Sequence, residues 1–103
     1  MQSGFHDINL NIHYTAPQEV WDKIDAVYMS MPFWAGYDDG PRWAGEGIDL
    51  SASVEPSGIQ IAGDMPEDIW EEWYSSLKMK LTEALGYEIG EPEDGYCFQY
   101  WDR

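Results

Sequence analysis

Two histidines and one cysteine are the residues best suited to nucleophilic or metal chemistry in this chain of 103 residues. His6 and His13 are an odd number of positions apart, so on one strand their side chains would point to opposite faces and could not share a metal ion. No Cys or His cluster has the spacing of a zinc site. Cys97 has no histidine near it in the sequence to hold it as a reactive thiolate. These residues therefore predict neither a metal centre nor a nucleophile.

Carboxylates are the other chemically active groups, and they are abundant: 20 Asp and Glu face 5 Lys and Arg. With so many acids, some pair approaches the geometry of an acid–base site by chance, so their number alone does not indicate an enzyme. The run 37–41 (YDDGP) lacks the alternating acids and terminal Glu of a calcium loop. No glycine-rich phosphate loop is present. We therefore expect no catalytic residue, no metal and no cofactor.

The formal net charge of −15 points instead to the kind of partner. Nucleic acid, anionic membranes and phosphate-rich ligands are disfavoured, and a basic protein surface is favoured. Solubility is the simpler explanation of an acidic surface. It is weakened here because so much like charge in a small volume repels itself. No base occurs between Trp43 and Leu77.

Three segments carry features of a protein interface. In the segment 32–45 aromatic residues stand beside acids, which suits an anchor next to a carboxylate that meets Arg or Lys. The second set lies on the outer face of a predicted helix, and the third lies in an acidic turn. The candidate partner-binding residues are Trp34, Tyr37, Asp38 and Asp39 in the first set, Asp68, Glu71, Glu72 and Met79 in the second, and Glu91, Glu93 and Asp94 in the third.

Each set has a plainer interpretation. The loop aromatics could close the rim of the core, with Phe33 and Trp43 the more core-like pair. The helix acids suit the helix dipole and solubility, although they lack basic partners four residues on. The acidic turn could simply be solvated. A fourth surface, the open face of the sheet, is predicted to be polar and uncharged, and so merely wet; its residues would be Asn9, Asn11, Ser51, Ser53 and Gln99.

Regular elements must position these residues, and the first is a strand. Residues 5–14 alternate, which predicts a strand with Ile8, Leu10, Ile12 and Tyr14 facing inward. Thr15 and Gln18 fit a capping box that opens a helix reaching Met31, with Val20, Ile24, Val27 and Met31 on its apolar stripe. Pro32 stops this helix. Residues 32–45 are rich in Gly and Pro and are predicted to form a loop.

A hairpin and a second helix follow. Residues 46–55 alternate, residues 56–58 form a turn, and Ile59 and Ile61 lie on the return strand. Asp64 to Glu67 fits a second helix start, and the helix runs to about Leu85 before Gly86. Its buried stripe would be Ile69, Trp70, Trp73, Leu77, Leu81 and Ala84.

Two short strands, 87–89 and 96–101, would complete the chain around the acidic turn. The element order is then β-α-β-β-α-β-β. Because every strand has one apolar and one polar face, a mostly antiparallel sheet with two helices on one face is expected. The fold class is therefore α+β, a two-layer sandwich, with residues 1–103 forming a single domain.

Part of the chain resembles a known class of proteins. The resemblance rests on the turn EPSG at 55–58, the helix carrying Trp70 and Trp73, and the run LGYEIGEPEDG at 85–95. This stretch, about half of the sequence, resembles small acidic bacterial immunity proteins that are encoded beside polymorphic or contact-dependent growth inhibition toxins. The resemblance implies that the chain neutralises a cognate toxin, often a nuclease, by tight binding. The segment 1–45 adds no motif that specifies the toxin.

Two other classes of function stay open. One is a different protein-interaction module, such as a nucleic-acid mimic that inhibits a DNA-binding protein. The other is a small enzyme or ligand-binding domain that uses the aromatic segment 32–45 as a pocket. The absence of a transmembrane-length apolar run and of a signal-peptide pattern, together with a single cysteine, predicts the reducing cytoplasm as the location.

Overall fold

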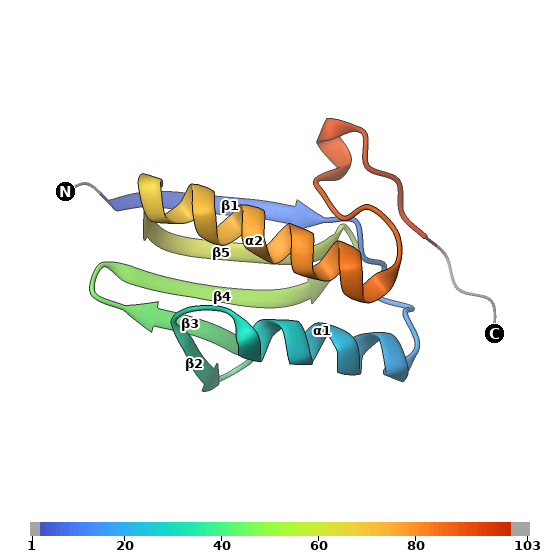
Figure 1. Ribbon diagram of the computed structural model, residues 1–103, viewed down its shortest axis with the longest axis horizontal. Coiled ribbons are helices and arrows are strands. Elements are labelled where there is room, and N and C mark those ends of the chain that lie inside the picture. Colours follow the sequence, from blue (N-terminus) through green and yellow to red (C-terminus); the bar gives the residue numbers. More distant parts are fainter. Residues whose placement is uncertain (1–2, 100–103) are drawn as a thin grey trace.

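The computed structural model describes residues 3–99, which form a five-stranded antiparallel sheet and two α-helices with their connections (Figure 1). The strands are β1 (Ser3–Leu10), β2 (Trp34–Tyr37), β3 (Pro41–Gly45), β4 (Ile48–Glu55) and β5 (Gly58–Pro66). They lie in the order β1-β5-β4-β3-β2, so β1 and β2 form the two edges. The predicted α+β class with a mostly antiparallel sheet is confirmed.

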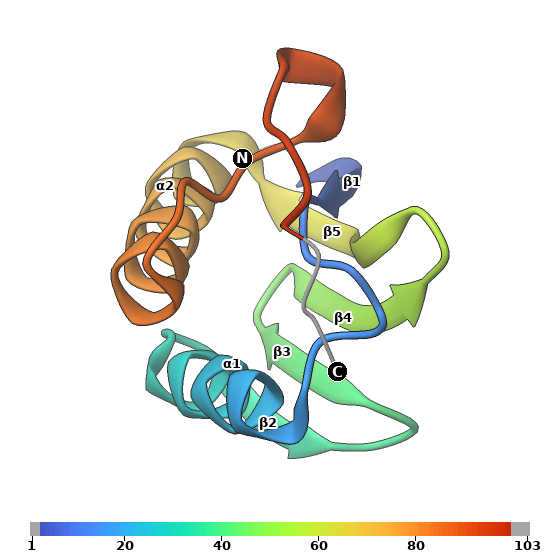
Figure 2. The same cartoon turned by 90° about the vertical axis from the view of Figure 1, so that its right-hand side faces the viewer.

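The helices α1 (Gln18–Ser30) and α2 (Glu67–Leu85) form the second layer. Figure 2 shows both on the same side of the sheet, with α2 beside β1 and β5 and α1 beside β2 and β3. The core lies between the layers, and its largest fully buried side chains include Leu10, Ile24, Trp43, Leu50, Ile61, Met65, Leu77 and Leu81. Within residues 3–99, no helix covers the opposite face of the sheet (Figure 2).

The apolar stripes of both helices are confirmed, but their predicted caps are wrong. Pro17 precedes α1 with extended backbone angles and makes no side-chain cap. Gln18 lies inside the helix and donates to Asp22, while the Thr15 hydroxyl contacts His13. At the second helix Pro66 takes the cap position, because β5 continues as far as Pro66 and holds Asp64 in the sheet. Gly86 ends α2 in the left-handed conformation, as predicted.

The segment 32–45 is a β-hairpin and not the predicted loop. Trp34 pairs with Trp43 and Tyr37 with Pro41, and an irregularity of the β-bulge type between Trp34 and Gly36 shifts the register. Asp39 and Gly40 both have positive φ, which lets the chain reverse over three residues between the strands. The two strands extend the sheet beyond β4 and bring Trp43 fully into the core.

The hairpin of β4 and β5 is confirmed, with Glu55 paired to Gly58 across the turn. Ile48, Leu50 and Ala52 face the core as predicted. Val54, near the end of β4, is 53% exposed. The first strand ends at Leu10, so the predicted inward position of Tyr14 is also wrong: Tyr14 is 55% exposed in the connection to α1.

No strand of the sheet follows α2 within the described residues, which contradicts the two predicted C-terminal strands. Residues 86–91 are irregular, Pro92–Asp94 form the short 3-10 helix η1, and Gln99 makes only an isolated bridge to Ile12. The end of the predicted strand, residues 100–101, lies outside the described residues. The element order is therefore β-α-β-β-β-β-α, and two of the five strands are not the segments predicted.

The side chain of Asn11 explains why the segment after α2 does not need to pair as a strand of the sheet. This side chain is fully buried, its Nδ2 donates to the carbonyls of Glu88 and Cys97, and its Oδ1 accepts from the backbone N–H of Gly90. One side chain thus satisfies backbone groups that strand pairing would otherwise satisfy. The prediction that Asn11 lies on the open face of the sheet is wrong.

Candidate protein-binding surface

The uncovered face of the sheet is acidic. Alternation along the strands turns Phe5, Asp7 and Asn9 of β1 outward, and the register places Asp64, Ala62 and Gln60 of β5 opposite them. On β4 the outward residues are Asp49, Ser51 and Ser53, followed by Arg42 and Ala44 on β3. The expectation that this face carries no charge is therefore wrong. The small side chains between the acids leave their carboxylates open to an approaching partner.

Two of these carboxylates oppose one another directly. Asp49 of β4 is the register partner of Asp64 of β5, and both are exposed. Like charges at opposing positions destabilise an antiparallel pair. Among the described residues Asp64 has no ion-pair partner within 4.0 Å. A cationic group of another molecule would relieve this repulsion.

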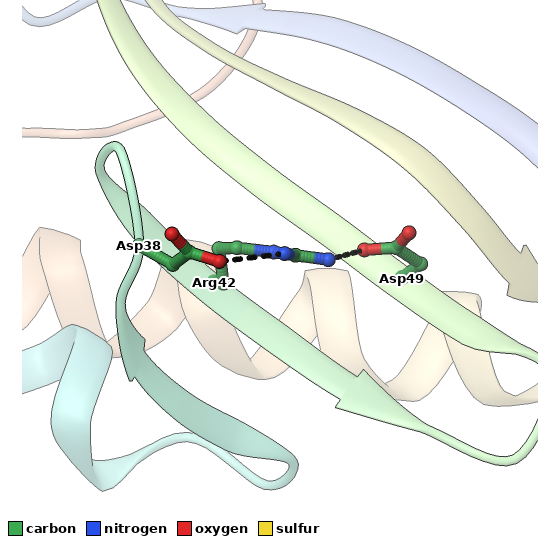
Figure 3. Close-up of polar contacts among 3 residues, drawn as sticks. All are labelled: Asp38, Arg42 and Asp49. Atoms are coloured by element: carbon green, nitrogen blue, oxygen red, sulfur yellow. Dashed lines mark hydrogen bonds and ion pairs between the residues drawn. The ribbon is translucent and has the colours of Figure 1, made fainter.

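Arg42 is the one base on the face within residues 3–99. Figure 3 shows its guanidinium between Asp38 and Asp49. Nη1 lies 3.3 Å from Oδ2 of Asp38, and Nη2 contacts Oδ1 of Asp49. The hydrogen bond to Asp49, followed by the charge of Asp49, raises the pKa of Arg42. Because Arg42 is already shared between two acids, it leaves this face with an excess of negative charge.

A shallow hollow of about 510 Å³ lies over this cluster, and Phe5, Asp38, Asp39, Arg42, Asp49 and Asp64 are among its lining residues. Phe5 is 68% exposed at its margin, opposite Asp64 in the register. The structure therefore brings an exposed aromatic ring and four carboxylates together. Of the sequence-predicted site residues, only Asp38 and Asp39 belong to this group.

The aromatic residues of the hairpin divide between core and surface. Trp43 is fully buried, and its indole N–H donates to the carbonyl of Tyr28. Trp34 is half-buried, with its ring 5.7 Å from that of Trp43. Tyr37 is 56% exposed and Phe33 38% exposed, so the expectation that Phe33 belongs with the core is wrong. Only Tyr37 of the predicted hairpin aromatics presents a mainly exposed side chain.

The set on the second helix lies apart from this face. Asp68, Glu71 and Glu72 are exposed on α2, in the helix layer, and no base of the described chain lies within 4.0 Å of them. Met79 is 70% exposed farther along the same helix. These residues are available to a partner, but one that contacts them approaches the layer opposite the open sheet face.

The third set lies beside β1, at one edge of the sheet. Glu91 is half-buried and accepts a hydrogen bond of 3.0 Å from the Tyr74 hydroxyl, so it has a structural contact. Glu93 and Asp94 are exposed in η1. Glu91 and Glu93 line one hollow together with Asp7 and Asn9 of β1, so η1 lies next to β1. The hairpin of β2 and β3 lies at the opposite edge of the sheet. The three predicted sets therefore do not form one continuous patch.

Sequence reasoning missed Phe5, Asp7, Arg42, Asp49 and Asp64. A signal was present for Asp7 and Asp49, since both occupy the outward positions of alternating segments. Asp64 could not be placed, because the end of β5 is not visible as an alternating pattern and fits a helix start equally well. Arg42 depends on the hairpin, which the sequence analysis does not predict.

Residues 3–99 contain no group of three or more His, Cys, Asp and Glu side chains placed to hold a metal ion. His6 stacks on Trp70 at 4.1 Å and contacts the Met65 carbonyl, while Cys97 is exposed. Within the same described range, no helix combines the length and apolar character needed to cross a membrane.

Comparison of the chain with protein-family models, curated proteins and solved structures finds no match.

Proposed function

We propose that this chain is an immunity protein that binds a cognate bacterial toxin through a basic surface and covers the toxin's active region. The observation that carries the proposal is the uncovered acidic face around Asp38, Asp39, Asp49 and Asp64. The same function is what the sequence resemblance of residues 51–101 implies. We propose no catalytic role, and we place the protein in the cytoplasm, where the toxin would otherwise act.

The charge of the molecule suits rapid capture of a basic partner. Of the described acids, only Asp38, Asp49 and Glu67 lie within 4.0 Å of a basic side chain. The charge of the other described acids is therefore not cancelled by a neighbouring base. Such a field can raise association rates to about 10⁸–10⁹ M⁻¹s⁻¹ at low salt. A nuclease domain that grips nucleic acid presents the complementary positive surface.

Slow dissociation needs contacts other than charge. Phe5 is 68% exposed and lines the same hollow as Asp38 and Asp39, and Tyr37, which directly precedes Asp38, is 56% exposed. Aromatic side chains that become buried at the centre of an interface dominate binding energy and limit dissociation. The acids would thus direct the encounter, and the two rings would hold the complex.

The test begins with capture of proteins from a lysate of the source organism at low salt, using the full chain as bait. Each captured protein is then expressed in a heterologous bacterium with and without this chain. We expect the partner to be basic, to arrest growth alone, and to become harmless on co-expression. A partner that is a harmless DNA-processing enzyme would overturn the toxin proposal in favour of nucleic-acid mimicry.

Two triple variants with the same change of charge locate the binding surface. One carries Asp39→Asn, Asp49→Asn and Asp64→Asn on the sheet face, and the other carries Asp68→Asn, Glu71→Gln and Glu72→Gln on α2. Because both raise the formal charge by three units, they reduce long-range attraction to a similar degree. We expect the sheet-face variant to weaken binding about 100-fold, as removal of interfacial charge contacts does, and the α2 variant less than about tenfold. The reverse order would assign the interface to α2.

A further inference from the structure

A second cavity lies on the helix side of the sheet, between α1 and the turn of the β2–β3 hairpin. Its volume is about 430 Å³, within the range of roughly 300–1,000 Å³ that ligand pockets span. The cavity is lined mainly by apolar surface from three elements. Trp21 and Tyr28 come from α1, Tyr37 and Pro41 flank the hairpin turn, and Val54 comes from the end of β4.

The walls are built by the spacing of the elements. Trp21 and Tyr28 are seven positions apart on α1, with Asp25 between them, so the three side chains share one helix face. The Trp21 indole N–H donates to the Ala16 carbonyl at 2.8 Å, which fixes the plane of the ring. Tyr28 is buried, whereas Tyr37 and Val54 leave more than half of their surface to solvent. The cavity thus has a fixed aromatic floor and an open apolar rim.

Two carboxylates reach the same cavity. Asp25 is half-buried on α1, and Asp39 is exposed in the hairpin turn. Neither lies within 4.0 Å of a basic side chain among residues 3–99, and no basic residue is among those that line the cavity. Burial raises the pKa of Tyr37, and the hydrogen bond and charge of Asp25 raise it further. The carboxylate of Asp25 therefore interacts with the Tyr37 hydroxyl as well as with solvent.

We propose that this cavity binds an arginine side chain of the protein partner. A guanidinium is planar and weakly hydrated, so it stacks on aromatic rings such as Trp21 or Tyr37. Its fork of N–H groups also matches the carboxylate of Asp25 or Asp39. A lysine ammonium has the charge but neither the plane nor the fork. An apolar side chain would leave the half-buried Asp25 without a counter-charge.

The inference deepens the proposed function by naming the side chain that a basic partner contributes. Asp39 lines both this cavity and the hollow over the sheet face, so the two sites meet at the hairpin turn. A partner that docks on the acidic face can therefore place one arginine around the turn and into the cavity.

Three short peptides test the cavity without the partner. They are acetyl-Gly-Arg-Gly-amide, its lysine counterpart, and its citrulline counterpart, which keeps the shape of arginine but has no charge. Each is titrated into the full ¹⁵N-labelled chain and followed by backbone and indole N–H shifts. We expect the arginine peptide to move the signals of Trp21, Tyr37 and Val54. It should bind at least about tenfold more tightly than either control.

Two isosteric variants provide the matched comparison. Asp25→Asn removes the half-buried carboxylate of the cavity, while Asp22→Asn removes an exposed carboxylate on the same helix that does not line the cavity. Both change the charge by one unit. We expect Asp25→Asn to weaken the arginine peptide about tenfold, and Asp22→Asn to have less than about a twofold effect. Dispersed spectra of both variants would show that they are folded.

Equal binding of the arginine and citrulline peptides, equal effects of the two variants, or shifts confined to other surfaces would overturn the inference. The captured partner separates this failure from failure of the proposed function. We expect Asp25→Asn to raise its dissociation rate about tenfold and to leave its association rate within about twofold. Neutralisation of the toxin without any arginine-peptide binding would leave the function standing and reject only the cavity. Peptide binding without any neutralised toxin would reject the proposed function and leave the arginine site standing.

Discussion

Asn11 shows how much one side chain can determine in a small domain. It follows β1 directly and makes hydrogen bonds of 2.7–2.9 Å with backbone groups of residues 88, 90 and 97. Its own carbonyl accepts a hydrogen bond from the Tyr87 hydroxyl. Buried polar groups are stable only when they are paired, so the segment after α2 and the end of β1 depend on each other.

Asn11→Ala should therefore be severely destabilising. It leaves the buried N–H of Gly90 and two part-buried carbonyls without their partner, and an unsatisfied buried group costs about 1–3 kcal/mol. We expect the free energy of unfolding, measured with urea, to fall by about 3 kcal/mol or more. Amide exchange should quicken first in residues 87–97. Asn9→Ala, at a position that is only half-buried, is the control and should change stability by less than about 1 kcal/mol. Equal losses in the two variants would contradict the central role of Asn11.

Tyr87 makes the same region sensitive to alkaline pH. Burial raises the pKa of Tyr87 to about 12, whereas a tyrosine in an unfolded chain has a pKa of about 10. Between these values the unfolded state has released its proton and the folded state has not, so stability falls as pH rises through this window. Below pH 10 both states keep the proton, and Tyr87 contributes no slope. Burial, followed by the charge of Glu91, also raises the pKa of Tyr74.

Tyr87→Phe should consequently flatten the decline of stability above about pH 10, although it loses the hydrogen bond to Asn11 and lowers stability at neutral pH. Urea unfolding at a series of alkaline pH values measures both effects. An unchanged slope in the variant would show that other groups cause the alkaline loss.

At the scale of elements, the close pairing of β4 and β5 depends on a glycine. Gly63 has φ +143°, and a Cβ atom there would collide with the backbone of Asp49 and Leu50. Gly86 also has positive φ, but nothing lies within 4 Å of the place its Cβ would take. The two positions share unfavourable backbone angles and differ in the space around them.

This difference predicts unequal effects of alanine. Gly86→Ala should lower stability by about 1 kcal/mol, the cost of a left-handed conformation. Gly63→Ala should lower it by at least about 3 kcal/mol, because the strands must also separate. Thermal and urea unfolding measure both. A Gly63→Ala variant as stable as Gly86→Ala would mean that the sheet yields easily at this point, close to the acidic face.

The elements that the sequence predicts correctly are those with a strong period. The stripes of α1 and α2 and the alternation of 48–52 follow burial directly, and they confirm the fold class. The β2–β3 hairpin escaped prediction because its Gly and Pro content is typical of loops. The Asp39-Gly40 pair was nevertheless a hairpin signal, since both residues adopt positive φ in the turn.

The candidate site was less predictable than the fold for a related reason. The acidic face arises from register: Asp49 and Asp64 are 15 positions apart in sequence and become neighbours only through strand pairing. The prediction of two C-terminal strands was wrong for the same reason. The alternation at 96–100 cannot reveal that the Asn11 side chain supplies hydrogen bonds that strand pairing would otherwise supply. Such long-range partners leave no periodic trace in a single sequence.

At the scale of the whole molecule, the net charge of −15 opposes folding. The molecule measures 46 × 28 × 23 Å, and at an ionic strength of about 0.01 M the Debye length of about 30 Å lets charges across it repel one another. Two such charges about 10 Å apart in water repel by roughly 0.4 kcal/mol. Unfolding moves them apart and relieves many of these contacts.

Added NaCl should therefore stabilise the chain. At about 1 M the Debye length shrinks to about 3 Å, so the free energy of unfolding should rise by at least about 1 kcal/mol. The α2 triple variant should show a smaller rise, because it has three fewer charges to screen.

The same salt should slow association with the basic partner, since screening weakens the attraction that directs the encounter. One charge distribution thus gives opposite salt dependences for folding and for binding. A chain destabilised by NaCl would indicate that Arg42 and the few other bases stabilise the fold more than the acids destabilise it. The acidity would then need no partner to explain it.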